Sequence, residues 1–173
     1  MDESPGWYLL VASAASIAVV GVLALATHQP FVFPSLGPTA YIVFATPLAL
    51  AACPRSVLGG HLVGVLAGVV GLLAFGLWGV APDLEDVTWA RVGAVTVALA
   101  LTLSVMTWLG VAHAPAGATT LIVALGLLDT VGDLVVMMAA VLVLVVVAAV
   151  INRVFGTATP WWGAPPGGVG KVS

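Results

Sequence analysis

The chain contains four long stretches of apolar residues that include no Asp, Glu, Lys or Arg. They cover residues 7–26, 57–80, 92–111 and 134–151. A helix needs about 20 apolar residues to cross the roughly 30 Å hydrocarbon core of a bilayer. Only 6% of the 173 residues are charged, against about 25% in soluble domains. We therefore predict an all-α membrane protein, and this composition excludes a soluble fold.

Two shorter apolar segments lie between the long stretches, and they repeat part of each other's sequence. Leu36–Val43 aligns with Ala116–Val123, 80 positions later, and the two share a Gly, a Thr and an Ile-Val pair. The segments run over 36–52 and 116–128, and helices of these lengths are too short to cross the bilayer. Paired short segments that open with Gly or Pro are a pointer to a transport site.

The repeat predicts six helical segments in two three-helix halves, at about 7–80 and 89–151. If the short segments cross fully, the six spans form inverted repeats. If they turn back, the protein has four spans and two re-entrant helices. We favour the inverted arrangement, with segments 2 and 5 short and able to be re-entrant.

Residues 1–156 are expected to form a single transmembrane helical domain, followed by a flexible tail at 157–173 that is rich in Gly and Pro. Arg153 and Lys171 favour a cytoplasmic C-terminus, because basic residues collect on the cytoplasmic side of membrane proteins. The predicted location is thus the cell membrane, with a multi-pass chain. Four Lys and Arg residues in total are too few for a nucleic-acid surface.

A binding site in such a chain has to be built from helix ends, hydroxyls, backbone amides and histidines. Free amides at a helix N-terminus carry partial positive charge and bind anions, and an imidazole can hydrogen-bond an anion or switch with protonation. The alternative is that the repeated turns only cap buried short helices. The predicted substrate-binding residues are Ser35, Gly37, Thr39, His61, His113, Gly117, Thr119 and Thr120.

Glycines recur on one face of the third segment, at Gly60, Gly64, Gly68 and Gly71. Small residues at this spacing let membrane helices approach closely, so we expect helix packing there, within the subunit or between subunits.

Three polar residues at segment ends have simpler interpretations. Arg55 is either a topology anchor or a pore-mouth residue that attracts anions. For His28 we expect an interfacial hydrogen bond. Asp133 is the expected N-cap of the last helix, and its pair with Asp129 lacks the partner groups of a catalytic site.

The segments around these residues resemble the HPP family of integral membrane proteins, named for a His-Pro-Pro motif. His113–Ile122 is similar to that motif and to the Gly-Ala-Thr-Ala sequence that follows it in the family. Ser35–Ala40, followed by Cys53–Leu62, resembles the family's other signature, which has Pro-Arg-Asn followed by Gly-Gly-His-Leu. Ala114 stands at the first proline of the motif and Ser56 at the Asn. The resemblance implies transport, since plastid and cyanobacterial members are associated with nitrite movement.

We predict a channel or transporter for a small monovalent anion such as nitrite. A bundle this small rarely encloses a wide pore, so we expect a homo-oligomer in the lipid bilayer. Two alternatives remain open: a pore for a small neutral solute or protonated acid, and a non-transporting membrane subunit that binds a partner through the glycine face. No nucleophile–base pair or metal-ligand cluster is apparent, so we expect no enzyme, no cofactor and no metal site.

Overall fold

The computed structural model describes residues 4–128, 130–160 and 162. The described residues form six α-helices and one 3-10 helix, without a β-strand. Their order along the chain is α1 (Gly6–Thr27), α2 (Leu36–Ala45), η1 (Leu50–Ala52), α3 (Pro54–Ala74), α4 (Trp89–Leu109), α5 (Ala116–Ala124) and α6 (Val131–Val154).

Four of these helices, α1, α3, α4 and α6, are long and apolar enough to span a membrane. The all-helical prediction is therefore confirmed. The two short segments are shorter than predicted. α2 ends at Ala45 and the chain turns into η1, while α5 ends at Ala124. At 1.5 Å per residue these helices reach only about 15 Å, half of the hydrocarbon core.

Local signals explain where the long helices begin and end. Thr88 caps α4 by accepting from the Arg91 amide at 3.2 Å, and Thr130 forms a capping box with Asp133 at the start of α6. The prediction that Asp133 is the N-cap is wrong, because Asp133 is the third helical residue of that box. α4 ends at Gly110, whose φ of 62° continues the chain in the left-handed region.

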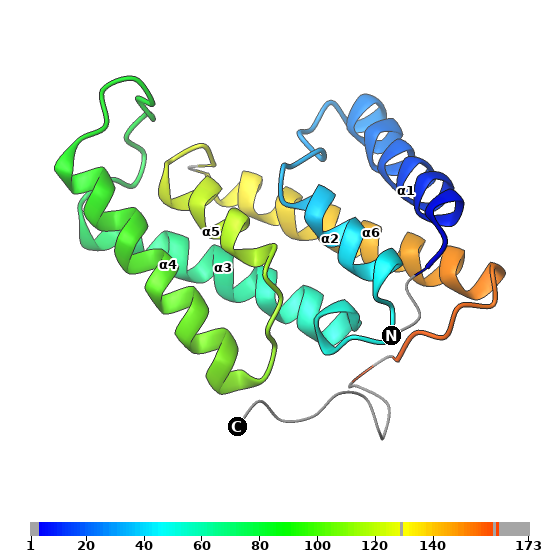
Figure 1. Ribbon diagram of the computed structural model, residues 1–173. Helices are drawn as coiled ribbons and strands as arrows, with labels where there is room; N and C mark the ends of the chain where they lie inside the picture. The colour runs from blue at the N-terminus through cyan, green and yellow to red at the C-terminus, as the bar shows by residue number, and fades with distance from the viewer. Residues whose placement is uncertain (1–3, 129, 161, 163–173) are drawn as a thin grey trace.

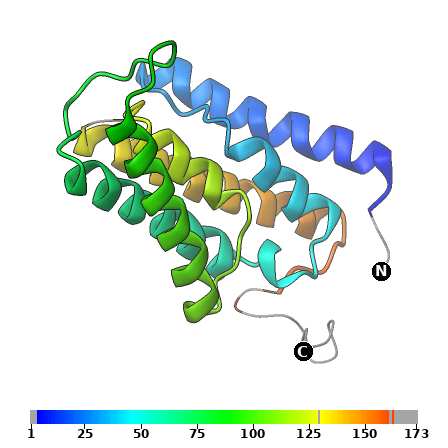
Figure 2. The same cartoon turned by 60° about the vertical axis from the view of Figure 1, so that its left-hand side comes forward.

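The helices pack as two bundles, and each bundle combines elements from both halves of the sequence (Figure 1). The first bundle consists of α1, α2 and α6. The second consists of α3, α4 and α5. Each short helix thus packs against the third helix of the other half, and α3 and α6 contact each other where the bundles meet. α1 and α4 lie on opposite flanks of the molecule, which Figure 2 shows from a second side.

The glycine face of α3 lies inside the second bundle. A Cβ on Gly64 would stand 2.7 Å from the Ala116 carbonyl oxygen, and one on Gly68 would stand 2.6 Å from the Val123 Cβ. The glycines therefore let α5 approach α3 within the chain. Because this face is occupied within the chain, it is not available to a partner subunit. The hypothesis of a non-transporting membrane subunit required it to be free.

The first residues beyond α6 pack back onto it. The Thr157 amide donates to the Asn152 carbonyl at 2.7 Å, and the Asn152 amide group donates to the Thr159 hydroxyl at 3.2 Å. The predicted flexible tail continues to residue 173. Its part at 163–173 lies outside the described residues, as does Asp129.

Candidate functional site

Four of the predicted site residues meet in the centre of the molecule, between the two bundles. Thr39 comes from α2 in the first bundle. Thr119 on α5, His61 on α3 and His113 just before α5 come from the second. All four side chains are fully buried.

Local structure brings these side chains together. Thr39 and Thr119 are each the fourth residue of their short helix, so both hydroxyls lie one turn inside a helix start. His61 lies two turns into α3. The neighbouring Gly60 leaves room for His113, since a Cβ there would stand 2.8 Å from the His113 Cβ. A larger residue at position 60 would push His113 away from α3.

Hydrogen bonds connect the four side chains. The Thr39 hydroxyl lies 3.0 Å from His61 Nε2 and 3.1 Å from His113 Nε2. His61 Nδ1 lies 2.7 Å from the Thr119 hydroxyl, and His113 Nδ1 lies 2.7 Å from the Ala51 carbonyl oxygen. A single imidazole, His61, therefore links the starts of both short helices.

The remaining predicted residues lie beside this cluster or away from it. The Thr120 hydroxyl contacts that of Thr102 at 2.7 Å instead of an imidazole. Ser35 is buried, and its hydroxyl has no hydrogen-bond partner among the described residues. Gly37 is exposed, and Gly117 is partly exposed. Both glycines lie outside the cluster.

The backbone amides at the start of α5 are already engaged. Those of Ala116, Gly117 and Ala118 each donate at 3.0 Å to a carbonyl of the preceding turn. The expectation of free amides is therefore wrong for α5 in this conformation. The polar groups that face the centre are side chains.

Arg55 is the second residue of α3. Its guanidinium donates to the carbonyl of Leu109, the last residue of α4, at 2.9 Å. A basic group near the last carbonyls of a helix offsets the negative end of its dipole. His28 is exposed at the end of α1 with a φ of 54°.

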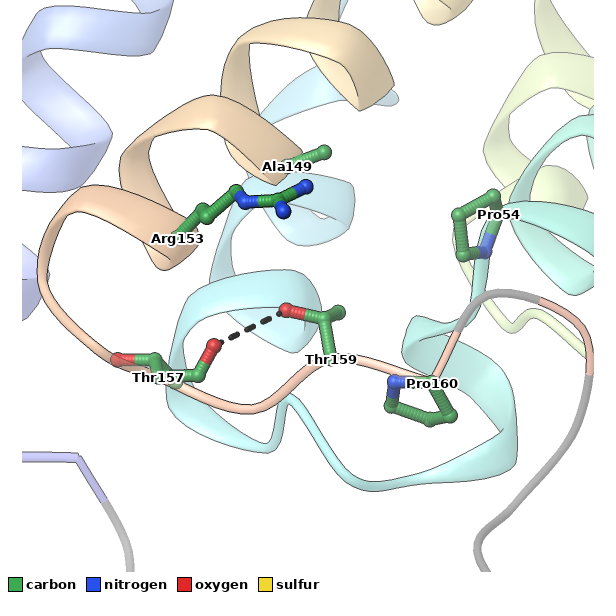
Figure 3. A pocket seen from close by; sticks show the side chains of 6 residues that line it. All are labelled: Pro54, Ala149, Arg153, Thr157, Thr159 and Pro160. Carbon is green, nitrogen blue, oxygen red and sulfur yellow. Dashed lines mark hydrogen bonds between the residues drawn. The ribbon is translucent and has the colours of Figure 1, made fainter.

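A hollow of about 210 Å³ opens at the end of α6, lined by Pro54, Ala149, Arg153, Thr157, Thr159 and Pro160 (Figure 3). A second, narrower cavity shares Pro54, Ala149 and Thr159 with it and reaches Val43 and Ala52. The second cavity thus borders η1 at Ala52, the residue after Ala51, whose carbonyl accepts from His113. The four side chains of the cluster are fully buried and line neither cavity.

Arg91 is a buried residue that the sequence analysis did not single out. It is 5% exposed, and its guanidinium donates to the Val80 carbonyl at 3.1 Å and to the Ala124 carbonyl at 3.5 Å. The signal was Thr88, an N-cap residue three positions earlier, which predicts that the helix begins before Arg91.

Within the described residues, no group of three or more His, Cys, Asp or Glu side chains is placed to hold a metal ion. A family model described as HPP, transmembrane region, matches residues 4–160. No curated protein and no solved structure matches the chain.

Proposed function

The chain belongs to the HPP transmembrane family, and from that premise we propose that it carries a small monovalent anion such as nitrite across the membrane. The proposed binding groups are the side chains of Thr39, Thr119, His61 and His113. The observation that supports this most is the position of His61, which bonds to a hydroxyl from each short helix.

Hydroxyls and imidazole N–H groups suit a small anion in this setting. They can replace part of its hydration shell by donating hydrogen bonds, while no fixed cation holds it in place. Among the described residues, no carboxylate makes a hydrogen bond to either imidazole. Ser35 adds a buried hydroxyl that is free to turn towards a ligand.

Transport requires the cluster to open, and the two bundles suggest how. Thr39 lies on the first bundle and its two imidazole partners lie on the second. Rocking of one bundle against the other around a central site is the usual route to alternating access. The conformation described is the closed one. A separation of α2 from α3 and α5 would expose the four binding groups.

A pore for the protonated, neutral acid is the second candidate. The absence of a charged side chain from the described cluster favours it, because a wall of hydroxyls and imidazoles accepts neutral solutes equally well. Uptake of weak-acid anions that rises as the external pH falls, without uptake of a strong-acid anion such as nitrate, would select this candidate.

The test is anion uptake by the protein in lipid vesicles, across a panel of nitrite, nitrate, formate and chloride, with protein-free vesicles subtracted. We expect uptake of at least one anion, and a large loss in Thr39→Val. Thr107→Val is the matched control, because Thr107 makes the same bond to a carbonyl four residues back but is exposed. Equal uptake in Thr39→Val and Thr107→Val would contradict the proposed site.

A further inference from the structure

The hydrogen-bonding groups of the cluster form one continuous line. Its four contacts run from Thr119 to His61 (2.7 Å), to Thr39 (3.0 Å), to His113 (3.1 Å) and to the Ala51 carbonyl (2.7 Å). Each histidine contributes both ring nitrogens, one on either side. The line crosses from the second bundle to the first and back.

The direction of every bond follows from the Ala51 carbonyl, which can only accept. His113 Nδ1 must therefore carry a proton, and in a neutral imidazole Nε2 is then an acceptor. In the contact with His113 the Thr39 hydroxyl is then the donor, and this contact shares its one proton with the Ser35 carbonyl. The Thr39 oxygen accepts from His61 Nε2–H, and His61 Nδ1 is left to accept from Thr119. Each group thus donates to the next, from Thr119 towards Ala51.

The Thr39 hydroxyl has a second hydrogen-bond acceptor within reach, which it can use when His113 is protonated. The Thr39 hydroxyl also lies 2.8 Å from the Ser35 carbonyl oxygen. When His113 carries protons on both nitrogens, Nε2 becomes a donor. The Thr39 hydroxyl then turns to the Ser35 carbonyl and accepts from both imidazoles. The hydrogen bonds of His113 are complete with or without the extra proton.

The hydrogen-bond partners that the described residues offer to the two imidazoles are neutral groups. The groups that face the imidazoles are the hydroxyls of Thr39 and Thr119, the Ala51 carbonyl and the other ring, at 5.1 Å between centroids. Among the described residues, no Asp, Glu, Lys or Arg side chain makes a hydrogen bond to either ring. An isolated charge is expensive in such a place. An anion and a proton that enter together offset each other.

Resting on the proposed function, we propose that this line is a proton relay and that one proton crosses with each anion. Water supplies the proton at one end and receives it at the other. At the Ala51 end, a narrow cavity borders the next residue, Ala52, and the relay requires water to reach His113 Nδ1 from that side. At the other end, water reaches His61 when the bundles separate, and the transfer through Thr39 follows once they have closed and the line is restored.

Each proton transfer begins at His61 and ends at water beside Ala51. A proton from water bonds to His61 Nδ1 as the Thr119 hydroxyl turns away. The N–H bond at His61 Nε2 breaks and that proton bonds to the Thr39 oxygen, whose own proton passes to His113 Nε2. The proton on His113 Nδ1 leaves to water beside Ala51. Both imidazoles are neutral again, and rotation of the hydroxyls and rings restores the first arrangement.

The experiment records anion uptake and internal pH together in vesicles that contain the protein, with a pH-sensitive dye inside and protein-free vesicles subtracted. An inward anion gradient is imposed without a pH gradient. We expect internal acidification in step with uptake, at one proton per anion, and uptake that does not respond to an imposed membrane potential.

His113→Gln removes the relay but keeps a polar side chain. We expect acidification to be lost and the remaining anion uptake to become sensitive to membrane potential, a change that a purely structural role would not cause. Thr39→Ser retains the hydroxyl and should retain acidification. His28→Asn is the control, because His28 is exposed and Asn tolerates its left-handed backbone.

Acidification in step with uptake that persists unchanged in His113→Gln overturns the relay and supports the pore for the neutral acid. Anion uptake without acidification, driven by membrane potential, overturns the relay and leaves the proposed function standing. Potential-driven acidification without uptake of any anion overturns the proposed function and supports a proton pathway. A folded protein with neither flux overturns both.

Discussion

The two bundles are built from equivalent segments but are held together differently. In the second bundle, Gly64 and Gly68 bring α3 into close contact with α5. In the first bundle, α6 carries Leu144 at the position equivalent to Gly64, and α2 keeps Gly37 exposed with open space around it. Polar contacts hold the first bundle together instead. The Tyr8 hydroxyl on α1 donates a hydrogen bond to the Asn152 side chain on α6.

The two bundles also differ in the side chains that they supply to the site. His113 precedes the turn of α5, whereas buried Phe33 stands at the equivalent position before α2. The first bundle supplies one hydroxyl, Thr39, and the second supplies both imidazoles. The repeat therefore provides two similar helix starts, and the departures from the repeat provide the site. The tight bundle holds the imidazoles in place, and the looser one is the part that we expect to move.

The largest effect is expected from Gly64→Leu, which gives α3 the residue that α6 carries at 144. A side chain at Gly64 meets the Ala116 carbonyl at 2.7 Å, so overpacking should destabilise the protein by about 3 kcal/mol. Thermal unfolding in detergent measures this. Gly21→Leu on α1 is the control, because no atom lies within 4 Å of its Cβ position. A wild-type Tm for Gly64→Leu would show that the close packing is not needed.

The two repeated threonines should differ in their importance. Thr39→Val leaves two ring nitrogens without a partner and Thr119→Val leaves one, so the expected losses of stability are about 2 and about 1 kcal/mol. Valine keeps the shape of threonine, and Thr107→Val is again the control. Equal losses at Thr39 and Thr119 would mean that the hydrogen bonds between the bundles stabilise the protein no more than the bond within the second bundle.

A smaller effect is expected where polar contacts tie the first bundle. Tyr8→Phe removes the hydroxyl that bonds to the buried Asn152 oxygen and should lower the free energy of unfolding by about 1 kcal/mol. Tyr41→Phe serves for comparison, since Tyr41 is 62% exposed. If the two substitutions have the same effect, the Tyr8–Asn152 contact does not stabilise this bundle.

The smallest effect is expected at Arg55. Its bond to the Leu109 carbonyl is solvent-exposed, so Arg55→Gln should change the stability by no more than about 0.5 kcal/mol. Anion uptake should change little as well, because Arg55 lies outside the cluster. A strong loss of uptake with unchanged stability would support the interpretation of Arg55 as a pore-mouth residue.

The sequence predicted the six helical segments and the four residues that meet at the centre, because apolar length and the repeated turns mark them directly. It misplaced helix starts at residues 89 and 131 by three positions each, although Thr88 and Thr130 are recognisable caps. The grouping of helices into bundles was not predictable. These helices are apolar on all sides, so no hydrophobic stripe indicates which neighbour each one faces.

The central claim is that the buried cluster opens to the anion. Ser35→Cys in a Cys53→Ser background tests it most directly, because the Ser35 hydroxyl is buried and has no hydrogen-bond partner among the described residues, while the Ser35 carbonyl accepts from Thr39. The measurement is the rate of reaction with a small thiosulfonate in vesicles. Ser16→Cys, buried on α1, is the matched control. The account predicts that Ser35→Cys reacts and that the transported anion slows the reaction, while Ser16→Cys stays unreactive. A Ser35→Cys thiol as inert as that at position 16 would contradict it.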